Sequence, residues 1–275
     1  MIDLVPIGGL CNRMRMIDAG LELGRRLQMP VRAHWMPSKD LGCPFHELFQ
    51  PIDGLEIVEG MWLASRLAFR FGRRPGLMHL SGWLWSTRYY YWNENKRLAH
   101  EVALLTPLQQ RRHVHIISDA RFVEPAEPYR VFRPLPMLQA SVDRVVQQFG
   151  PRTVGVHIRR ADNVLAIERS PDHLFISAMD NELEANGDTR FFLATDSMEV
   201  KRDLRARYGD RVITNHALLD RTSREGMQHA LVELYALSNT HHILGSYFSS
   251  FSQAASEIGR IGLTVLCEEE GKPRD

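Results

Sequence analysis

The chain alternates between short apolar runs and amphipathic segments, and this pattern predicts an α/β fold. Residues 2–7 form an apolar run, interrupted by Asp3, that is typical of a buried strand. The glycine pair Gly8-Gly9 follows, and then a segment with approximate helical spacing of apolar residues that Pro30 ends. Residues 31–35 are expected to form the next strand. A strand, a glycine turn, a helix and a second strand together indicate the start of a parallel α/β domain.

The second half of the chain repeats this alternation with clearer boundaries. We expect strands at 153–158, 190–195, 212–214, 242–245 and 263–266. We expect helices at 141–149, 171–183, 197–208, 225–238 and 251–259, with Gly209 as a left-handed cap. Pro134 and Pro136 indicate a linker between the two halves. The sequence therefore predicts an N-terminal α/β domain at 1–136 and a Rossmann-like domain at 137–275.

Residues 60–130 do not show this alternation and are rich in tryptophan, tyrosine and arginine. Two interpretations of this region stay open. It can form a helical layer packed on the sheet, with arginine stems covering aromatic faces. Alternatively, it can form a wall that binds an acceptor, because aromatic faces suit sugars and arginines suit anions.

Composition narrows the class of protein. The 275 residues are 44% hydrophobic and 24% charged, as in ordinary globular proteins, and the net charge of +1 gives no field that would attract nucleic acid. Four of the 34 basic residues are lysine (Lys39, Lys96, Lys201 and Lys272), and the others are arginine. No apolar run reaches the roughly 18 residues of a membrane span, although peripheral membrane contact stays possible.

Cysteine usage bears on the cellular compartment. Cys11, Cys43 and Cys267 are an odd number with no C-x-x-C pair, so we expect neither a disulfide framework nor a zinc site. The N-terminus has no basic stretch of the secretory type. We therefore expect a cytoplasmic protein in a reducing compartment.

Two loops at expected strand ends carry candidate chemistry. In the first, Gly8 and Gly9 let backbone amides approach a phosphate or sugar at a helix N-terminus. The loop lacks the G-x-G-x-x-G and G-K-[ST] patterns, which disfavours a dinucleotide enzyme or a P-loop kinase. In the second, His157 and Arg159 share one direction of the strand. Asp162 can pair with one of the two arginines at 159–160, and the other can clamp a diphosphate; alternatively, an arginine–aspartate pair merely fastens the loop.

Helix starts give the third set of candidates. Ser250 with Gln253 fits an S-x-x-Q capping box, and serine hydroxyls with free amides at a helix start can also hold a phosphate. Asp196 with Glu199 resembles a second capping box. Capping alone accounts for both patterns as well as ligand binding does.

Together these segments resemble motifs of the fucosyltransferase superfamily, which includes α1,2-, α1,6-, rhizobial nodulation-factor and protein O-fucosyltransferases. The matching stretches are GGLCNRM, HIRRAD, FFLATDS, and LVELYALS followed by SSFSQAA, in the family's order from residue 8 to about 257. The resemblance implies a GT-B-like fold, with two Rossmann-like domains facing across a cleft. It also implies a GDP-fucose donor, a glycan or related acceptor, inversion at the anomeric carbon, and no metal or other cofactor. No Asp-x-Asp pair of the metal-binding kind occurs in the sequence.

The resemblance also implies roles for single residues. Its catalytic candidates are Arg159 as the phosphate-binding arginine, Asp162 as the motif's carboxylate, and Glu168 as the base. Its nucleotide-sugar-binding candidates are Gly8, Gly9, Asn12, His157, Arg159, Asp196, Glu233, Ser250, Ser252 and Gln253. Among these, Glu233 aligns with an acidic residue that reads the guanine edge.

Two departures from the family pattern leave alternatives open. Cys11 stands where the family has glycine, so we expect the first loop to reach positive φ less easily. Ser197 replaces the second aspartate of the ATDD motif. The alternatives are a non-catalytic nucleotide-binding protein of the same fold, and a glycosyltransferase that uses another nucleotide sugar.

Overall fold

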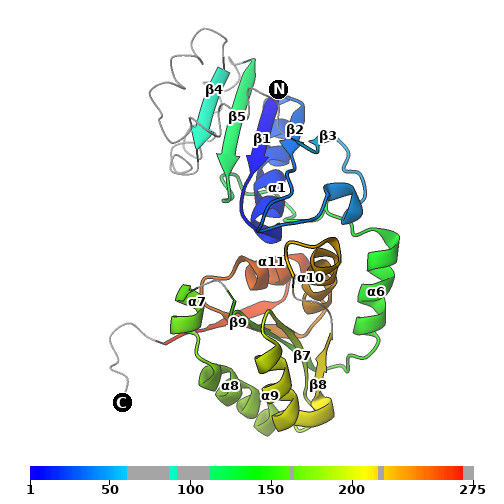
Figure 1. The fold of residues 1–275 in the computed structure, drawn as a ribbon, viewed down its shortest axis with the longest axis vertical. Helices are drawn as coiled ribbons and strands as arrows, with labels where there is room; N and C mark the ends of the chain where they lie inside the picture. Colours follow the sequence, from blue (N-terminus) through cyan, green and yellow to red (C-terminus); the bar gives the residue numbers. More distant parts are fainter. Residues whose placement is uncertain (61–86, 92–111, 162–163, 216–219, 269–275) are drawn as a thin grey trace. The chain divides into compact units, whose positions relative to one another are not determined.

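The structure is a computed structural model of residues 1–275, and it describes residues 1–60, 87–91, 112–161, 164–215 and 220–268. The chain divides into two compact units, one of Met1–Leu135 with Arg221–Met227 and one of Pro136–Asp220 with Gln228–Asp275. Each unit is built around its own five-stranded parallel sheet (Figure 1). The assignment of an acceptor side to 1–136 and a nucleotide side to 137–275 stays a prediction.

The sheet of the first unit has the strand order β3-β2-β1-β5-β4. Its strands are β1 (Ile2–Pro6), β2 (Val31–His34), β3 (Leu55–Val58), β4 (Thr87–Tyr91) and β5 (His113–Ser118). The helix α1 (Leu10–Leu27) covers one face of the sheet. Gly20 of this helix lies against Leu4, and Gly24 lies against Val31, so a side chain at either glycine would displace the strand residues. A short 3₁₀ helix, η1 (Phe45–Glu47), follows β2.

The sheet of the second unit has the strand order β10-β9-β6-β7-β8. Its strands are β6 (Thr153–Ile158), β7 (Arg190–Thr195), β8 (Val212–Thr214), β9 (His242–Ser246) and β10 (Gly262–Leu266). Its helices are α6 (Pro136–Val146), α7 (Val164–Arg169), α8 (Asp172–Ala185), α9 (Met198–Tyr208), α10 (Arg224–Leu237) and α11 (Ser250–Gly259), and the turn η3 (Gly209–Arg211) follows α9. The first residues of α10 group with the first unit.

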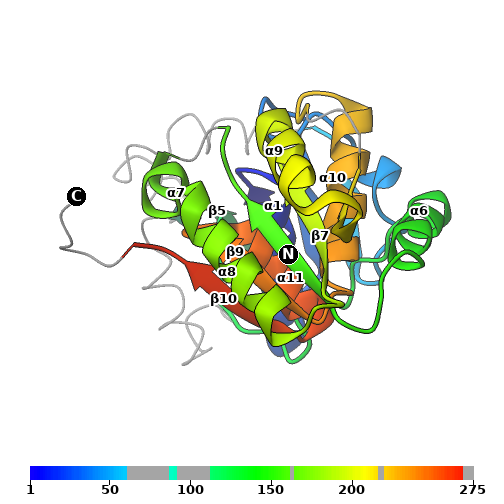
Figure 2. The same ribbon diagram turned by 90° about the horizontal axis from the view of Figure 1, so that it is seen from below.

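Helices cover both faces of the second sheet (Figure 2). On one face, Phe175 and Met179 of α8 and Leu204 of α9 pack against Val154 and Phe191 of the strands. On the other face, Gly155 of β6 leaves space for Leu237 at the end of α10, and Gly245 of β9 lies against Ser252 of α11. All six residues of β6 are buried, because this central strand has a neighbour on each side and a helical layer on each face.

Most elements expected from the sequence are present, and the main errors lie in the first unit. The strands at 55–58, 87–91 and 113–118 were not predicted. The two later strands contradict a purely helical layer over residues 60–130, although much of that region, including its tryptophans, lies outside the described residues. The helix α6 begins at Pro136, five residues before the expected start, since proline suits the first position of a helix. The expected linker therefore ends before Pro136.

Candidate functional site

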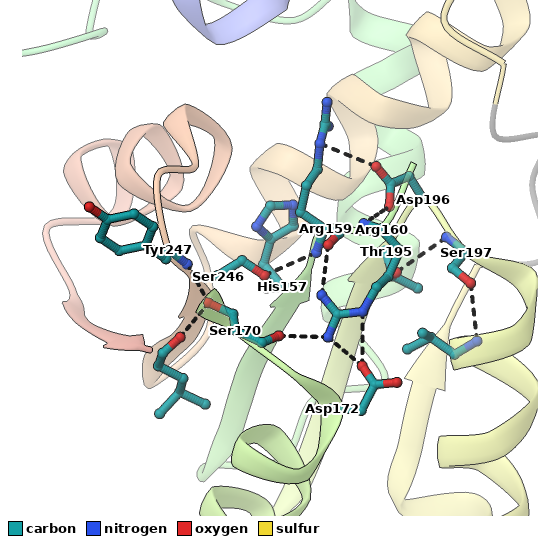
Figure 3. Close-up of polar contacts among 12 residues, drawn as sticks. His157, Arg159, Arg160, Ser170, Asp172, Thr195, Asp196, Ser197, Ser246 and Tyr247 are labelled. Carbon is teal, nitrogen blue, oxygen red and sulfur yellow. Dashed lines mark hydrogen bonds and ion pairs between the residues drawn. The ribbon is translucent and has the colours of Figure 1, made fainter. Parts of the chain in front are cut away.

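The carboxyl ends of β6, β7 and β9 form the candidate site of the second unit. The chain runs from β6 outward through β7 to β8, and then returns to the other side of β6 to form β9 and β10. This reversal between β6 and β9 is a topological switch point, where parallel α/β sheets bind ligands beyond their carboxyl ends. The residues at and just beyond these strand ends include His157, Arg159, Arg160, Asp196, Ser246 and Tyr247 (Figure 3).

Arg159 follows β6 directly and is oriented by groups from both neighbouring strands. Its backbone N–H donates to Ser246 Oγ of β9 at 3.0 Å, and Ser246 Oγ donates in turn to the carbonyl of His157 at 3.3 Å. Its Nε lies 3.3 Å from Asp196 Oδ2, at the end of β7. The loop and its first arginine are therefore fixed at the switch point, with the Asp196 carboxylate as a counter-ion (Figure 3).

Arg160 points into a different set of partners and fastens the loop to the protein. Its guanidinium donates to Asp172 Oδ1, with the Nε–Oδ1 distance 2.9 Å, and to the carbonyls of Arg159 and Ser170 at 2.7 Å each. Its backbone N–H donates to Asp196 Oδ1 at 2.6 Å. The sequence left open whether the arginines fasten the loop or clamp a diphosphate. In the structure Arg160 fastens the loop, and Arg159 lies at the strand end.

His157 is buried beneath the loop. Its ring stacks on Phe251 of α11, with ring centroids 4.8 Å apart, and its Nδ1 lies 3.5 Å from Ser249 Oγ. Burial, and second the nearby positive charge of Arg159, lower the pKa of His157 to about 3. The imidazole is therefore neutral, and it can donate or accept one hydrogen bond per nitrogen but carries no charge.

The start of α11 faces the same edge of the sheet, with a different cap from the one expected. Ser249 is the N-cap residue and Ser250 is the first helical residue, so the expected Ser250–Gln253 capping box is wrong. Ser249 makes no side-chain capping bond. Ser252 is buried against Gly245, and Gln253 is exposed. A helix start without a side-chain cap presents backbone amides and the positive end of the helix dipole to an anion.

Asp196 is likewise not a helix cap. Ser197 is the N-cap of α9, and its hydroxyl accepts from the Val200 N–H. The expected Asp196–Glu199 capping box is therefore wrong. The carboxylate of Asp196 instead receives Arg159 and the backbone of Arg160, which is stronger because those partners include a full positive charge.

Glu233 lies on α10 and forms a buried pair with Lys201 of α9. Lys201 Nζ lies 3.4 Å from Glu233 Oε1 and donates to the Asn215 carbonyl at 2.8 Å. Burial raises the pKa of Glu233, Lys201 opposes this rise, and the negative charge of Asp196 adds to it, so that the pKa is about 7. Lys201 connects Glu233 to the carboxyl end of β7, because α9 begins directly after Asp196 and its N-cap Ser197.

Of the two remaining catalytic candidates, the structure describes Glu168. Glu168 lies on the exposed surface of the short helix α7. Asp162 lies outside the described residues. α7 is nevertheless fixed beside the site, because Ser170 Oγ accepts from the Tyr247 N–H at 2.8 Å and Arg169 lies over the Tyr247 ring at 5.5 Å.

The glycine loop belongs to the first unit. Gly8 has φ +80°, whereas Gly9 is the N-cap of α1 with φ −76°. Cys11 is a buried helical residue, so its side chain does not restrict the turn, and the expected conflict with positive φ is wrong. Asn12 Oδ1 accepts from Arg15 Nη2 at 2.9 Å, and Arg13 Nε donates to the Gly8 carbonyl at 2.8 Å.

Several partners in the site were missed by sequence reasoning. They are Lys201, Asp172, Ser246 and Ser249. The signal for Ser246 and Ser249 was their place at the end of a predicted strand, and the signal for Lys201 was its being one of four lysines among 34 basic residues. Within the described ranges, no cluster of three or more His, Cys, Asp or Glu side chains could hold a metal ion. No helix in the described part of the chain is long and apolar enough to cross a membrane.

No protein-family model matches the sequence, and no match was found among curated proteins. Solved structures do match. The chain is 18% identical to NodZ α-1,6-fucosyltransferase soaked with GDP-fucose, over 94% of this chain and 92% of that one, with a TM-score of 0.59. It is 15% identical to a single-residue mutant of Arabidopsis thaliana FUT1 in complex with GDP, over 98% and 70% of the two chains, with a TM-score of 0.66. It is 10% identical to POFUT1 in complex with GDP, over 96% and 98%, with a TM-score of 0.56.

These likenesses span nearly the whole chain and agree with two parallel sheets with interleaved helices. The expected α/β architecture with two Rossmann-like units is confirmed, whereas the expected cleft between them stays a prediction. The protein has the GT-B-like fold of the fucosyltransferases.

Proposed function

We propose that the protein is a glycosyltransferase that moves fucose from GDP-fucose to a hydroxyl of a glycan or related acceptor. The observation that carries this proposal is Arg159 at the switch point of the nucleotide-type sheet, held by Asp196 and Ser246. The fold shared with fucosyltransferases solved with GDP or GDP-fucose supports the same donor. The shared fold does not identify the acceptor.

The proposed reaction is a single displacement with inversion. The acceptor oxygen attacks the anomeric carbon, the bond from that carbon to the β-phosphate oxygen breaks, and GDP leaves with the electron pair. Arg159 and the amides at the start of α11 stabilise the negative charge that develops on the diphosphate. These groups supply positive charge without a metal ion, so we propose a metal-independent reaction. The acceptor proton passes to a base, for which Glu168 is the candidate on α7.

Glu233 is the proposed group for base recognition. Guanine presents two adjacent N–H donors, at N1 and N2, and an ionised carboxylate accepts both. Lys201 connects Glu233 to the carboxyl end of β7, where Asp196 holds Arg159, so one unit contains candidates for both the base and the diphosphate.

We also propose a cytoplasmic location. Cys11 and Cys43 are buried thiols and Cys267 is an exposed one, and none of the three forms a disulfide. An exposed free thiol suits a reducing compartment.

The test has two stages. First, GDP, ADP and UDP are titrated calorimetrically into the wild type, Arg159→Ala and Arg202→Ala, the last being a matched control on the exposed surface of α9. We expect selective GDP binding that Arg159→Ala loses and Arg202→Ala keeps. Second, GDP release from GDP-fucose is followed with a panel of glycan acceptors, with and without a chelator. No nucleotide binding would refute the proposal, and selective GDP binding without transfer would favour a non-catalytic nucleotide-binding protein.

A further inference from the structure

Lys201 and Glu233 form a buried ion pair that the proposed reaction does not itself require. They lie on different helices, α9 and α10, and both side chains are more than nine-tenths buried. The Nζ–Oε1 distance is 3.4 Å, and Nζ also donates to the Asn215 carbonyl at 2.8 Å. Two ions removed from water contribute little net stability compared with apolar residues of similar size. Stability alone therefore explains this pair poorly.

The surroundings of Glu233 favour its neutral form, and Lys201 opposes them. Burial raises the pKa of Glu233, and the like charge of Asp196 at the end of β7 raises it further. Lys201 is the group that lowers it, both by its charge and by its hydrogen bond. On α10 itself, His229 lies one turn before Glu233 and is partly buried. Among the described residues, Lys201 is the cation paired with Glu233, while Arg159 is paired with Asp196.

The ionisation state of a carboxyl group decides which purine it can recognise. An ionised carboxylate only accepts hydrogen bonds, so it matches the N1–H and N2–H donors of guanine. A protonated carboxyl has one donor and one acceptor, so it matches N1 and the N6 amino group of adenine. A change in the charge of Glu233 would thus weaken guanine binding and favour adenine.

We propose that Lys201 sets the base specificity of the nucleotide site by pairing with the Glu233 carboxylate and fixing its Oε1. Lys201 is a positioning residue that does not touch the nucleotide. The inference rests on the proposed function, because it takes Glu233 as the group that meets the base. A lysine suits this role, since its compact ammonium can point at one carboxylate oxygen and one carbonyl at once.

The test compares the ratio of GDP to ADP affinity across pH, measured by calorimetry between about pH 6 and about pH 8.5. The diphosphate titrates alike in both nucleotides, so the ratio isolates the base. In the wild type we expect the ratio to fall by up to about tenfold per pH unit below the titration of Glu233. In Lys201→Met the fall begins at higher pH, so the ratio at neutral pH drops at least about tenfold and recovers as pH rises. Lys201→Arg keeps most of the wild-type profile, and Glu233→Gln gives a low ratio that does not change with pH.

A merely structural role gives a different result. A ratio in Lys201→Met that equals the wild-type ratio at every pH would overturn the proposal, whatever happens to the absolute affinity. If Lys201→Met does not fold, the wild type is compared with Glu233→Gln instead. GDP is titrated into each near neutral pH in two buffers of different ionisation enthalpy, which gives the number of protons released on binding. The proposal requires proton release from the wild type and none from Glu233→Gln. If the wild type binds GDP and Glu233→Gln has the same affinities, this inference and the assignment of Glu233 to base recognition fall, and the proposed fucose transfer stands. If the wild type binds no nucleotide, both fall.

Discussion

Arg159 and Arg160 follow the same central strand, yet each guanidinium meets a different carboxylate. Arg159 Nε lies 3.3 Å from Asp196 Oδ2, and Arg160 Nε lies 2.9 Å from Asp172 Oδ1 (Figure 3). Arg160 also donates to two backbone carbonyls, so its donors are directed into the protein. Arg159 lies at the switch point, where a ligand would be bound. We therefore propose that Arg159 serves the reaction and Arg160 the fold, and the two roles can be separated by experiment.

Replacement of Arg159 by alanine is expected to lower turnover by roughly 10²–10³-fold, as for the loss of one preorganised donor to a leaving group. The fold should be retained, because the backbone N–H of residue 159 still donates to Ser246 Oγ. The measurement is kcat for GDP release from GDP-fucose, together with the thermal midpoint of unfolding. Full activity in Arg159→Ala would show that another group neutralises the diphosphate.

Replacement of Arg160 by alanine is expected to lower the free energy of unfolding by about 2–3 kcal/mol, because it removes a charged pair and leaves the Ser170 and Arg159 carbonyls without these donors. The measurement is urea unfolding of Arg160→Ala beside Arg159→Ala. Equal stability of the two variants would contradict the assignment of Arg160 to structure.

Local sequence patterns were enough to place the core of the second unit. The strands at 153–158, 190–195 and 212–214 have the predicted bounds, because each is an apolar run with polar or glycine-containing turns at its ends. The strand at 113–118 was missed because it carries His113 and His115, which reduce its apolar character. His115 lies 3.7 Å from the buried Asp3 of the neighbouring strand β1, so its polarity is met by a residue more than a hundred positions away. No local pattern contains that information.

In the candidate site, too, local sequence patterns do not reveal partners that are far apart in the sequence. The candidates His157 and Arg159 were proposed from their place at a strand end, and Asp196 from a helix start and the family resemblance. The capping role expected for Asp196 was wrong because two long-range partners, Arg159 and Arg160, compete for its carboxylate more strongly than a helix amide does. Lys201 and Glu233 are 32 positions apart, and only the packing of α9 and α10 brings them together. Sequence reasoning thus located the loops but not the pairing within them.

The two glycines of the first loop should differ in their tolerance of a side chain. Gly8 has φ +80°, and a Cβ there would lie 2.8 Å from Asn12 Nδ2. Gly8→Ala is therefore expected to lower the free energy of unfolding by about 1–2 kcal/mol. Gly9 has φ −76°, and its Cβ would meet nothing closer than the Asp40 carbonyl at 3.8 Å. Gly9→Ala is the matched control with little expected change, and chemical denaturation that ranks the two variants the other way would refute this account.

Replacement of Glu168 tests whether this residue is the base that accepts the acceptor proton. Its carboxyl group is exposed on α7, so Glu168→Gln should fold as the wild type does and bind GDP with the same affinity. We expect kcat to fall by roughly 10²-fold or more, as for the loss of a general base. The measurement is kcat against pH, alongside the dissociation constant of GDP. An unchanged kcat would exclude Glu168 and leave the base to another carboxylate or to solvent.

His157 and Glu233 should make the free energy of unfolding change with pH in opposite directions. Burial lowers the pKa of His157 to about 3, so the unfolded chain takes up this proton below about pH 6.5 and the folded protein does not. Its contribution to stability is thus present above that pH and is lost as pH falls toward 3. The pKa of Glu233 is raised to about 7, so the folded protein binds that proton first, and stability is gained as pH falls from about 7 toward the ordinary value near 4.5.

Each group changes the free energy of unfolding by up to about 1.4 kcal/mol per pH unit in the shared window of about pH 4.5 to 6.5, so the two nearly cancel in the wild type. When one of the two groups is replaced, the pH dependence due to the other is no longer cancelled and can be measured. In His157→Gln the free energy of unfolding should rise as pH falls through this window, relative to the wild type, and in Glu233→Gln it should fall. The measurement is urea unfolding of the three proteins at several pH values. Parallel profiles for all three would mean that neither group titrates differently in the folded and unfolded states, because a loss of packing alone lowers stability equally at every pH.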